Sequence, residues 1–390
     1  MQSPKRSLMT PGSEAEPENA KPFYFRNLNG LRFFAAFLVI IEHSSTFANA
    51  INPTLSNFTF HQLPKLGNYG VKFFFVLSGF LITYLLLREV EQHQKVSIKN
   101  FYIRRILRIW PLYFLVGIGG TIAGPIVLNK LGVPVQGNIA TNLSFVALFA
   151  VNLQLVFSPF NRGIVEILWS VCLEEQFYLI WAPAFQFFKK RVLMLSVLSV
   201  AIGLLTPVAF DFFATIYNGK MHRPNYYFTT SAFTFFGLGS FASYSLKHEL
   251  PILKTKLFSK AAQLGVLLTL ALMIPKIIPM SPGFERYWSN LSIGLLFVHI
   301  ILSAVSDNSL LNLEFRPLIW LGKISYGLYL YHTVVLQILV RILYKFSPNG
   351  GTLVYEFLLP LLGLGITAFI SHISFFFFET KFLRMKDKFR

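Results

Sequence analysis

Two ionisable side chains share one face of the first apolar segment of this 390-residue sequence. Arg32 and His43 are eleven residues apart, which corresponds to about three helical turns and a rise of about 16 Å. Glu42 directly precedes the histidine. Because a charge inside a bilayer is costly, a histidine beside a carboxylate there indicates a general base and the group that orients it. The alternative is a histidine that only packs and hydrogen-bonds between helices.

A second polar pattern lies in the fourth apolar segment. Ser170, Glu174 and Tyr178 recur at every fourth residue, so a helix carries them as one stripe, while Glu175 points elsewhere. We predict that Glu174 fixes the tautomer of His43, as the acid of a catalytic triad does. The alternative is a protonated carboxyl group that bridges two helices.

Three arginines, Arg104, Arg105 and Arg108, begin the third apolar segment. They are typical of a cytoplasmic flank, where they set membrane topology. Because the start of a helix disfavours cations, three arginines there also need a compensating benefit, and an anion site for phosphate groups would provide it. Anionic lipid would satisfy the same pattern.

A third stripe, formed by Ser325, Tyr329 and His332, follows the spacing of one helix face late in the sequence. Packing between helices and lining of a substrate path are equally good interpretations of it. The single cysteine, Cys172, excludes a disulfide framework and a thiolate metal site, so we expect no metal. We interpret it as a small apolar filler.

The composition dictates what kind of protein must position these side chains. Hydrophobic residues make up 54% of the chain and charged residues 13%, against about 25% charged residues in soluble domains. This excludes a disordered chain, a coiled coil and an ordinary cytosolic enzyme. We predict an all-α transmembrane bundle with about ten spans, near residues 28–47, 69–88, 109–128, 165–187, 192–213, 227–246, 261–279, 287–305, 317–342 and 353–378.

The charge distribution predicts the topology. With ten spans and both termini in the cytoplasm, 25 of the 35 Lys and Arg residues lie inside. A shorter apolar run at 141–157 could be an eleventh span or re-entrant, but an eleventh span would flip every later loop and remove the bias. We divide the chain into a flexible cytoplasmic tail (1–27) without a cleavable signal peptide, a membrane domain (28–380) and a basic cytoplasmic tail (381–390). Basic residues spread over alternate loops also argue against a nucleic-acid partner.

Taken in order, six segments resemble acyltransferase family 3, a family of multi-span O-acyltransferases. The segments are the Arg-x10-His pattern of 29–43, the Phe-Phe-x-Leu-Ser-Gly-Phe-Leu signature within 70–83, Arg-x-x-Arg at 105–108, Trp-Ser-x-x-x-Glu-x-x-Phe-Tyr at 169–178, the Ser-Tyr-Gly-Leu-Tyr-Leu-Tyr-His segment 325–332, and Phe-Glu at 378–379. Two positions depart from the family pattern: Lys72 stands where an acid is frequent, and Glu42 where an apolar or aromatic residue is usual.

The resemblance implies transfer of an acyl group, usually acetyl from acetyl-CoA, to a hydroxyl of a carbohydrate or other cell-envelope molecule. It also implies an integral protein of the bacterial inner membrane that uses acyl-CoA as a co-substrate and has no permanently bound cofactor. We expect His43 to be the base and Glu174 its partner, with the acyl-CoA held by Arg32, Arg104, Arg105 and Arg108. The candidates that contact the substrate or the oxyanion are Glu42, Ser78, Trp169, Ser170, Tyr178, Tyr329 and His332.

The alternative function is a transporter of an organic anion or a lipid-linked sugar. Ten spans with polar residues at membrane depth would suit one. Against it, the sequence lacks a pair of helices broken by Gly or Pro at matching places in two halves. A receptor without chemistry would leave the polar stripes unexplained.

Overall fold

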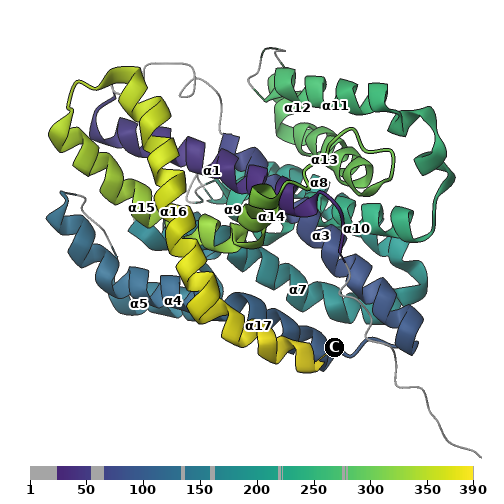
Figure 1. Ribbon diagram of the computed structural model, residues 1–390. Helices are drawn as coiled ribbons and strands as arrows, with labels where there is room; N and C mark the ends of the chain where they lie inside the picture. The colour runs from purple at the N-terminus through teal and green to yellow at the C-terminus, as the bar shows by residue number, and fades with distance from the viewer. Residues whose placement is uncertain are drawn as a thin grey trace, which may run out of the picture.

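The computed structural model describes residues 24–53, 66–132, 137–158, 163–217, 221, 223–274, 277 and 280–389. Every regular element in these ranges is helical, which confirms the predicted all-α class (Figure 1). Most of the predicted N-terminal tail, residues 1–23, lies outside the described residues.

The helices follow the apolar runs of the sequence in order, with several shorter helices between them. Their bounds are α1 (Leu28–Ile51), α3 (Leu66–His93), α4 (Ile98–Lys130), α5 (Ile139–Ala147), α6 (Val151–Phe157), α7 (Trp169–Phe188), α8 (Val192–Tyr217), α9 (Pro224–Tyr227), α10 (Phe233–Lys247), α11 (Lys260–Met273), α12 (Pro282–Tyr287), α13 (Ser289–Val305), α14 (Arg316–Lys323), α15 (Ser325–Phe346), α16 (Leu359–Ser374) and α17 (Thr380–Lys386). Short helical turns join some of them, among them η1 (Gly163–Leu168) and η2 (Lys189–Arg191).

Six helical segments of the described chain are long and apolar enough to cross a membrane. They are Leu28–Ile51, Leu66–His93, Ile98–Lys130, Gly163–Phe213, Ser325–Phe346 and Leu353–Phe389. The segment Gly163–Phe213 joins α7 and α8 through η2, where the sequence predicts two spans. Lys260–Met273 and Ser289–Val305 are apolar but shorter. The chain is therefore an integral membrane protein, and the number of ten spans stays a prediction.

The ambiguous run at 141–157 is divided between two short helices, α5 and α6. The break falls at Phe149, whose positive φ of 51° is unusual for a residue with a side chain. Helices of nine and seven residues rise only about 14 and 10 Å, so neither can cross a bilayer. The polar side chains of the run bond within the protein: Gln154 donates to Asn142 at 2.7 Å, and the amides of Asn152 and Gln176 hydrogen-bond each other.

Small residues let α3 and α10 pack in direct backbone contact at the centre of the bundle. A Cβ atom added to Gly239 would lie 2.0 Å from the carbonyl oxygen of Val76, and one added to Gly79 would lie 2.1 Å from that of Phe236. Interfaces of this kind are typical of membrane helices, where close approach replaces the hydrophobic driving force. The packing fixes the part of α3 that carries Ser78.

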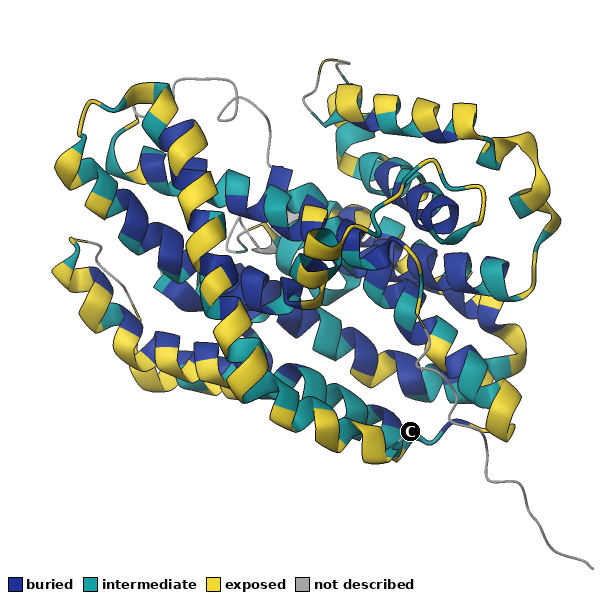
Figure 2. Cartoon of the chain, in the orientation of Figure 1, coloured by how far each residue is buried: buried dark blue, intermediate teal, exposed yellow. Residues whose placement is uncertain are grey.

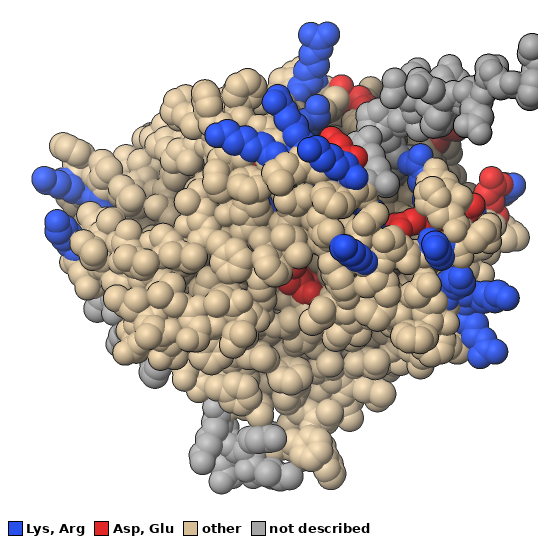
Figure 3. All heavy atoms as spheres, turned by 90° about the horizontal axis from the view of Figure 1, so that it is seen from below, with Lys and Arg blue, Asp and Glu red and all other residues tan. Residues whose placement is uncertain are grey.

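The outer surface is apolar, as lipid contact requires. Leu361 and Phe369 on α16 are each 66% exposed, and Figure 2 shows that exposed residues lie along the outer side of this helix. The face drawn in Figure 3 is mostly uncharged, with most of its Lys and Arg toward the edges and few charged groups near the middle. An apolar surface of this extent on a folded protein marks an interaction surface, here for the bilayer.

Contacts between charged or polar side chains gather several helix ends at one end of the bundle. These ends are the C-terminal ends of α3, α7 and α10, the N-terminal part of α4 and the chain after α17. The contacts are Arg104 with Glu89 (2.7 Å) and with the carbonyl oxygen of Phe389 (2.8 Å), Lys189 with the carbonyl oxygen of Gln94 (2.8 Å), and Lys247 with Glu91 (2.5 Å).

Candidate active site

Two histidines from helices distant in sequence meet side by side. His43 on α1 and His332 on α15 lie with Nδ1 and Nε2 2.7 Å apart, and their rings are nearly parallel, 11° apart. His332 is fully buried, and its Nδ1 lies 3.2 Å from the carbonyl oxygen of Leu328 one turn earlier. The stripe on α15 therefore brings His332 into direct contact with the predicted base.

A second contact joins the same two helices nearer their N-terminal ends. Arg32 Nε donates to the hydroxyl of Ser325 at 3.2 Å. The two contacts fix α1 against α15 at two levels, so the arginine and the histidine of α1 lie along one helix pair, as their spacing predicts. The polar stripe of α15 thus contacts both Arg32 and His43 of α1, through Ser325 and His332.

Glu174 lies in a cluster of opposite charges and hydroxyl groups. Tyr178 donates to its carboxylate at 3.1 Å, and Ser78 lies beside the same group. The electrostatic neighbours of this carboxylate include Arg32 and Arg108. The neighbours of this carboxylate are therefore two hydroxyl groups and the arginines of α1 and α4, and the predicted contact with His43 is not among them.

The three arginines of α4 divide between two environments, because consecutive residues of a helix point in different directions. Arg105 and Arg108 are electrostatic neighbours of Arg32. Arg104 forms an ion pair with Glu89 in which both side chains are largely buried. It also donates to the last part of the chain. Arg104 therefore joins helix ends through these two contacts, and its predicted contact with acyl-CoA stays a prediction.

A pair of hydroxyl groups joins α7 to α15 about one turn before His332. Ser170 Oγ and Tyr329 OH are 2.6 Å apart, both side chains are buried, and the Tyr329 ring is 5.9 Å from that of His332. The two stripes predicted on α7 and α15 therefore meet at this pair.

Two further candidates lie in other local environments. Trp169 packs against the rings of Tyr226 and Tyr227, at centroid distances of 4.6 and 5.2 Å. Glu42 accepts a hydrogen bond from the backbone N–H of Gly67 at 2.5 Å, which ties α1 to the start of α3. Neither contact joins these side chains to the histidine pair.

Sequence reasoning missed the partner of His43. The stripe containing His332 is visible in the sequence, but nothing in its spacing says which helix it faces. Glu379, which the resemblance identifies only as part of the Phe-Glu motif, has Arg108 among its electrostatic neighbours and accepts a hydrogen bond from Ser374.

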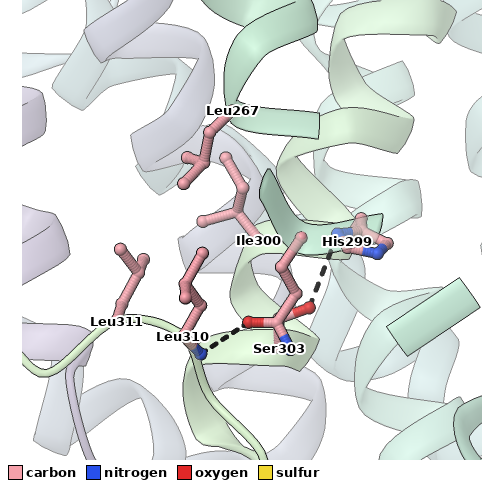
Figure 4. Close-up of a pocket in the computed structure, with 7 residues that line it drawn as sticks. Leu267, His299, Ile300, Ser303, Leu310 and Leu311 are labelled. Carbon is pink, nitrogen blue, oxygen red and sulfur yellow. Dashed lines mark hydrogen bonds between the residues drawn. The ribbon is translucent and has the colours of Figure 1, made fainter. Parts of the chain in front are cut away.

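A cavity in another part of the bundle is too small to bind a substrate. It lies between α11, α13 and the chain at Leu310 and Leu311, and its lining includes His299 (Figure 4). Its volume of about 10 Å³ leaves room for about one water molecule. Gln263 there accepts a hydrogen bond from the N–H of Leu310 and donates to the carbonyl oxygen of Asn308, so the polar groups fasten a loop to α11.

Comparison with known proteins identifies the family. A family model described as an acyltransferase domain matches residues 25–377. Peptidoglycan O-acetyltransferase OatA of Listeria monocytogenes is 28% identical over 376 residues, covering 92% of this chain and 55% of the relative. O-acetyltransferase OatA of Staphylococcus aureus is 28% identical over 381 residues, covering 92% of this chain and 57% of the relative. The chain thus spans about half the length of these curated relatives, and no solved structure matches it.

The family match begins before α1 and continues beyond α16, so it includes the helices that carry the histidine pair, the arginines and Glu174. The motifs that suggested the resemblance occur in the same order over the same length of chain. The chain belongs to the acyltransferase domain family, acyltransferase family 3.

Proposed function

We propose that the protein is a membrane O-acyltransferase that moves an acetyl group from acetyl-CoA to a hydroxyl of a cell-envelope carbohydrate. The family and the relatives named as O-acetyltransferases support this reaction class. The observation that carries the proposal is the arrangement along α1: Arg105 and Arg108 are electrostatic neighbours of Arg32, and a histidine pair forms about 16 Å further along the helix. Nothing in the comparisons favours the transporter alternative.

The proposed topology has ten spans, with both termini in the cytoplasm of a bacterium and the bundle in its inner membrane. The gathering of the basic helix ends at one end of the bundle supports this orientation, because basic residues concentrate on the cytoplasmic side. The membrane domain then comprises residues 28–380, and residues 381–390 form a basic cytoplasmic segment.

In this proposal the acyl donor, acetyl-CoA, enters the bundle from the end at which Arg32, Arg105 and Arg108 lie. Acetyl-CoA carries several phosphate charges and cannot cross the bilayer, so its nucleotide stays at the cytoplasmic face. Arg105 and Arg108 hold the phosphates, since guanidinium groups match phosphate geometry, and Arg32 holds the pantetheine arm or a phosphate. Glu174 offsets part of the positive charge of the cluster and orients these arginines. The arm then extends along α1 toward His43.

The reaction is direct transfer with His43 as general base. The imidazole takes the proton of the acceptor hydroxyl as its oxygen attacks the acetyl carbonyl carbon. A C–O bond forms, the C–S bond of the thioester breaks, and the CoA thiolate leaves. The thiolate then takes up the proton from His43, so the products are the acetyl ester and CoA with its thiol.

The Ser170–Tyr329 pair supplies the hydrogen bond to the oxyanion in this proposal. Two hydroxyl groups hold two protons, and one of them closes the 2.6 Å bond between them. The other can point to a developing oxyanion, since the contact from Tyr329 to the carbonyl oxygen of Ile167 is long, at 3.5 Å. A preorganised donor of this kind costs no rearrangement during the reaction.

The test uses purified full-length protein in detergent with acetyl-CoA labelled in the acetyl group and peptidoglycan fragments as acceptors. We expect CoA release that depends on the acceptor, and labelled glycan among the products. His43→Ala should abolish both, while the control His299→Ala, which replaces a histidine of α13 outside the site, should retain them. No CoA release by the wild-type protein with any envelope glycan, or full activity of His43→Ala, would refute the proposal.

A further inference from the structure

The hydrogen bonds of His332 determine which of its ring nitrogens carries the proton. Its Nδ1 lies 3.2 Å from the carbonyl oxygen of Leu328. A carbonyl oxygen can only accept, so Nδ1 must donate and therefore carries the hydrogen. In a neutral imidazole the other nitrogen, Nε2, then has a lone pair and accepts. The side chain is fully buried, so water does not compete for either nitrogen.

This assignment fixes the tautomer of His43 in turn. The Nε2 atom of His332 lies 2.7 Å from Nδ1 of His43. Because Nε2 accepts, Nδ1 of His43 must be the N–H donor. The second nitrogen of His43, Nε2, is then left with the lone pair. A base needs this lone pair for the proton that it receives.

We infer that His332 is the positioning residue of the transferase site: it holds His43 in the tautomer with a basic Nε2, and its hydrogen bond stabilises the imidazolium that forms after proton uptake. This inference rests on the proposed function and deepens it. In a serine protease triad a carboxylate orients the catalytic histidine and stabilises its protonated form. Here the imidazole of His332 has this role. Both candidate carboxylates are bonded elsewhere: Glu174 to Tyr178, and Glu42 to the backbone of Gly67.

A neutral partner suits a base at membrane depth. An unpaired carboxylate would bring a charge into the bundle in the resting state, which is costly there. The pair of neutral rings carries no charge until His43 accepts the proton. Its Nδ1–H bond to His332 then becomes a charge-assisted hydrogen bond and strengthens at the moment when the charge appears.

The proton balance leaves His332 unchanged by the reaction. The acceptor proton moves to Nε2 of His43 and from there to the CoA thiolate. The Nδ1 proton of His43 stays in its bond to His332, and the Nδ1 proton of His332 stays on the bond to Leu328. His332 therefore touches neither the acetyl group nor the acceptor in the proposed reaction, and its effect on the rate passes through the base.

Two substitutions at the same position separate positioning from packing. His332→Leu removes the acceptor and keeps an apolar side chain, whereas His332→Gln offers an amide oxygen near the place of Nε2. The matched pair of controls is His299→Leu and His299→Gln. His299 also lies on an apolar helix and bonds a backbone carbonyl, with Nε2 2.7 Å from the oxygen of Leu257, but it lies outside the site.

The assay measures CoA release at varied acetyl-CoA for the full-length variants in detergent, with the melting temperature recorded for each. We expect kcat of His332→Leu to fall by about 10²–10⁴-fold with little change in KM for acetyl-CoA, because general-base catalysis contributes about this much. His332→Gln should recover at least tenfold of that loss. Both His299 variants should keep kcat within about threefold of the wild-type value.

Three results would overturn the inference while the wild-type protein remains active and His43→Ala inactive. They are a kcat of His332→Leu near the wild-type value, an equal loss in the Gln and Leu variants when both have wild-type melting temperatures, or an effect on KM alone. An inactive wild-type protein instead contradicts the proposed transferase function itself, so the two failures are distinguishable.

Discussion

Replacing Tyr329 by Phe tests the proposed oxyanion donor with the smallest possible change. The substitution removes one oxygen atom and keeps the ring. Ser170 and Tyr329 are 5% and 6% exposed, so the Ser170 hydroxyl that loses its partner has little access to water. The bond between the two is short, 2.6 Å.

The expected effects on activity and on stability differ in size. Loss of one oxyanion donor costs about 2.7–4 kcal/mol of transition-state stabilisation, which is about 10²–10³-fold in kcat. Loss of the hydrogen bond costs the folded state about 1–3 kcal/mol, since one buried hydroxyl is left unsatisfied. Tyr329→Phe should therefore remain folded, with a modestly lower melting temperature, and lose most of its activity.

The assay is a double-mutant cycle on CoA release at saturating acetyl-CoA, with Tyr329→Phe, Ser170→Ala and the double variant. If the two hydroxyls act as one donor, the double variant should lose little more activity than Tyr329→Phe alone. Tyr331→Phe is the matched control. It removes a phenol oxygen from the same helix that donates to Ser374, at 2.9 Å, and not to Ser170.

A kcat of Tyr329→Phe within about threefold of the wild-type value refutes the assignment of the oxyanion donor. The same conclusion follows if Tyr331→Phe loses as much activity as Tyr329→Phe, because the loss then reflects the helix and not the hydroxyl pair. Fully additive losses in the cycle would contradict the claim that the two hydroxyls act as a unit.

Two further predictions concern the donor site and the packing. Arg105→Ala should raise KM for acetyl-CoA by at least about tenfold, as expected for a lost hydrogen bond to a charged group. Arg104→Ala should leave KM unchanged and lower the melting temperature, because it breaks the ion pair with Glu89. Equal KM values for the two variants would contradict the division of the arginines between two environments. Gly239→Ala should lower the free energy of unfolding by about 1–3 kcal/mol, because the added Cβ would lie 2.0 Å from a backbone oxygen of α3. The control Gly265→Ala should be neutral or stabilising, because a Cβ at this position meets no atom within 4 Å. Thermal unfolding in detergent checks the second pair, and equal melting temperatures of the two glycine variants would speak against the close packing of α3 and α10.

The local pattern of the sequence determined the helices and the faces of their polar side chains. Each predicted apolar run carries a helix, because backbone groups in a bilayer can be satisfied only within helices or closed barrels. The spacing of Arg32 and His43 on α1, and of Ser325 and His332 on α15, depends only on the helical repeat. These relations follow from the chain itself.

Some helix boundaries were not predictable from hydropathy. The run at 141–157 is broken at Phe149, and the run at 317–342 is divided into α14 and α15 at Ile324. Hydropathy averages over a window of residues and does not detect a change of backbone direction at one of them. α4 begins at Ile98, well before the apolar run at 109–128, because a helix can extend beyond its apolar part. Its arginines therefore lie within the helix and not at its start.

The partners across helices were decided only by the tertiary structure. His43 and His332 are 289 residues apart in sequence, and Ser170 and Tyr329 are 159 apart. Helical periodicity says which residues share a face, but it carries no information on which other face packs against it. The sequence alone thus determined the base, the arginines and the hydroxyl stripes as candidates. The packing of α1, α7 and α15 decided that a second imidazole contacts His43, and it placed Glu174 near the arginines.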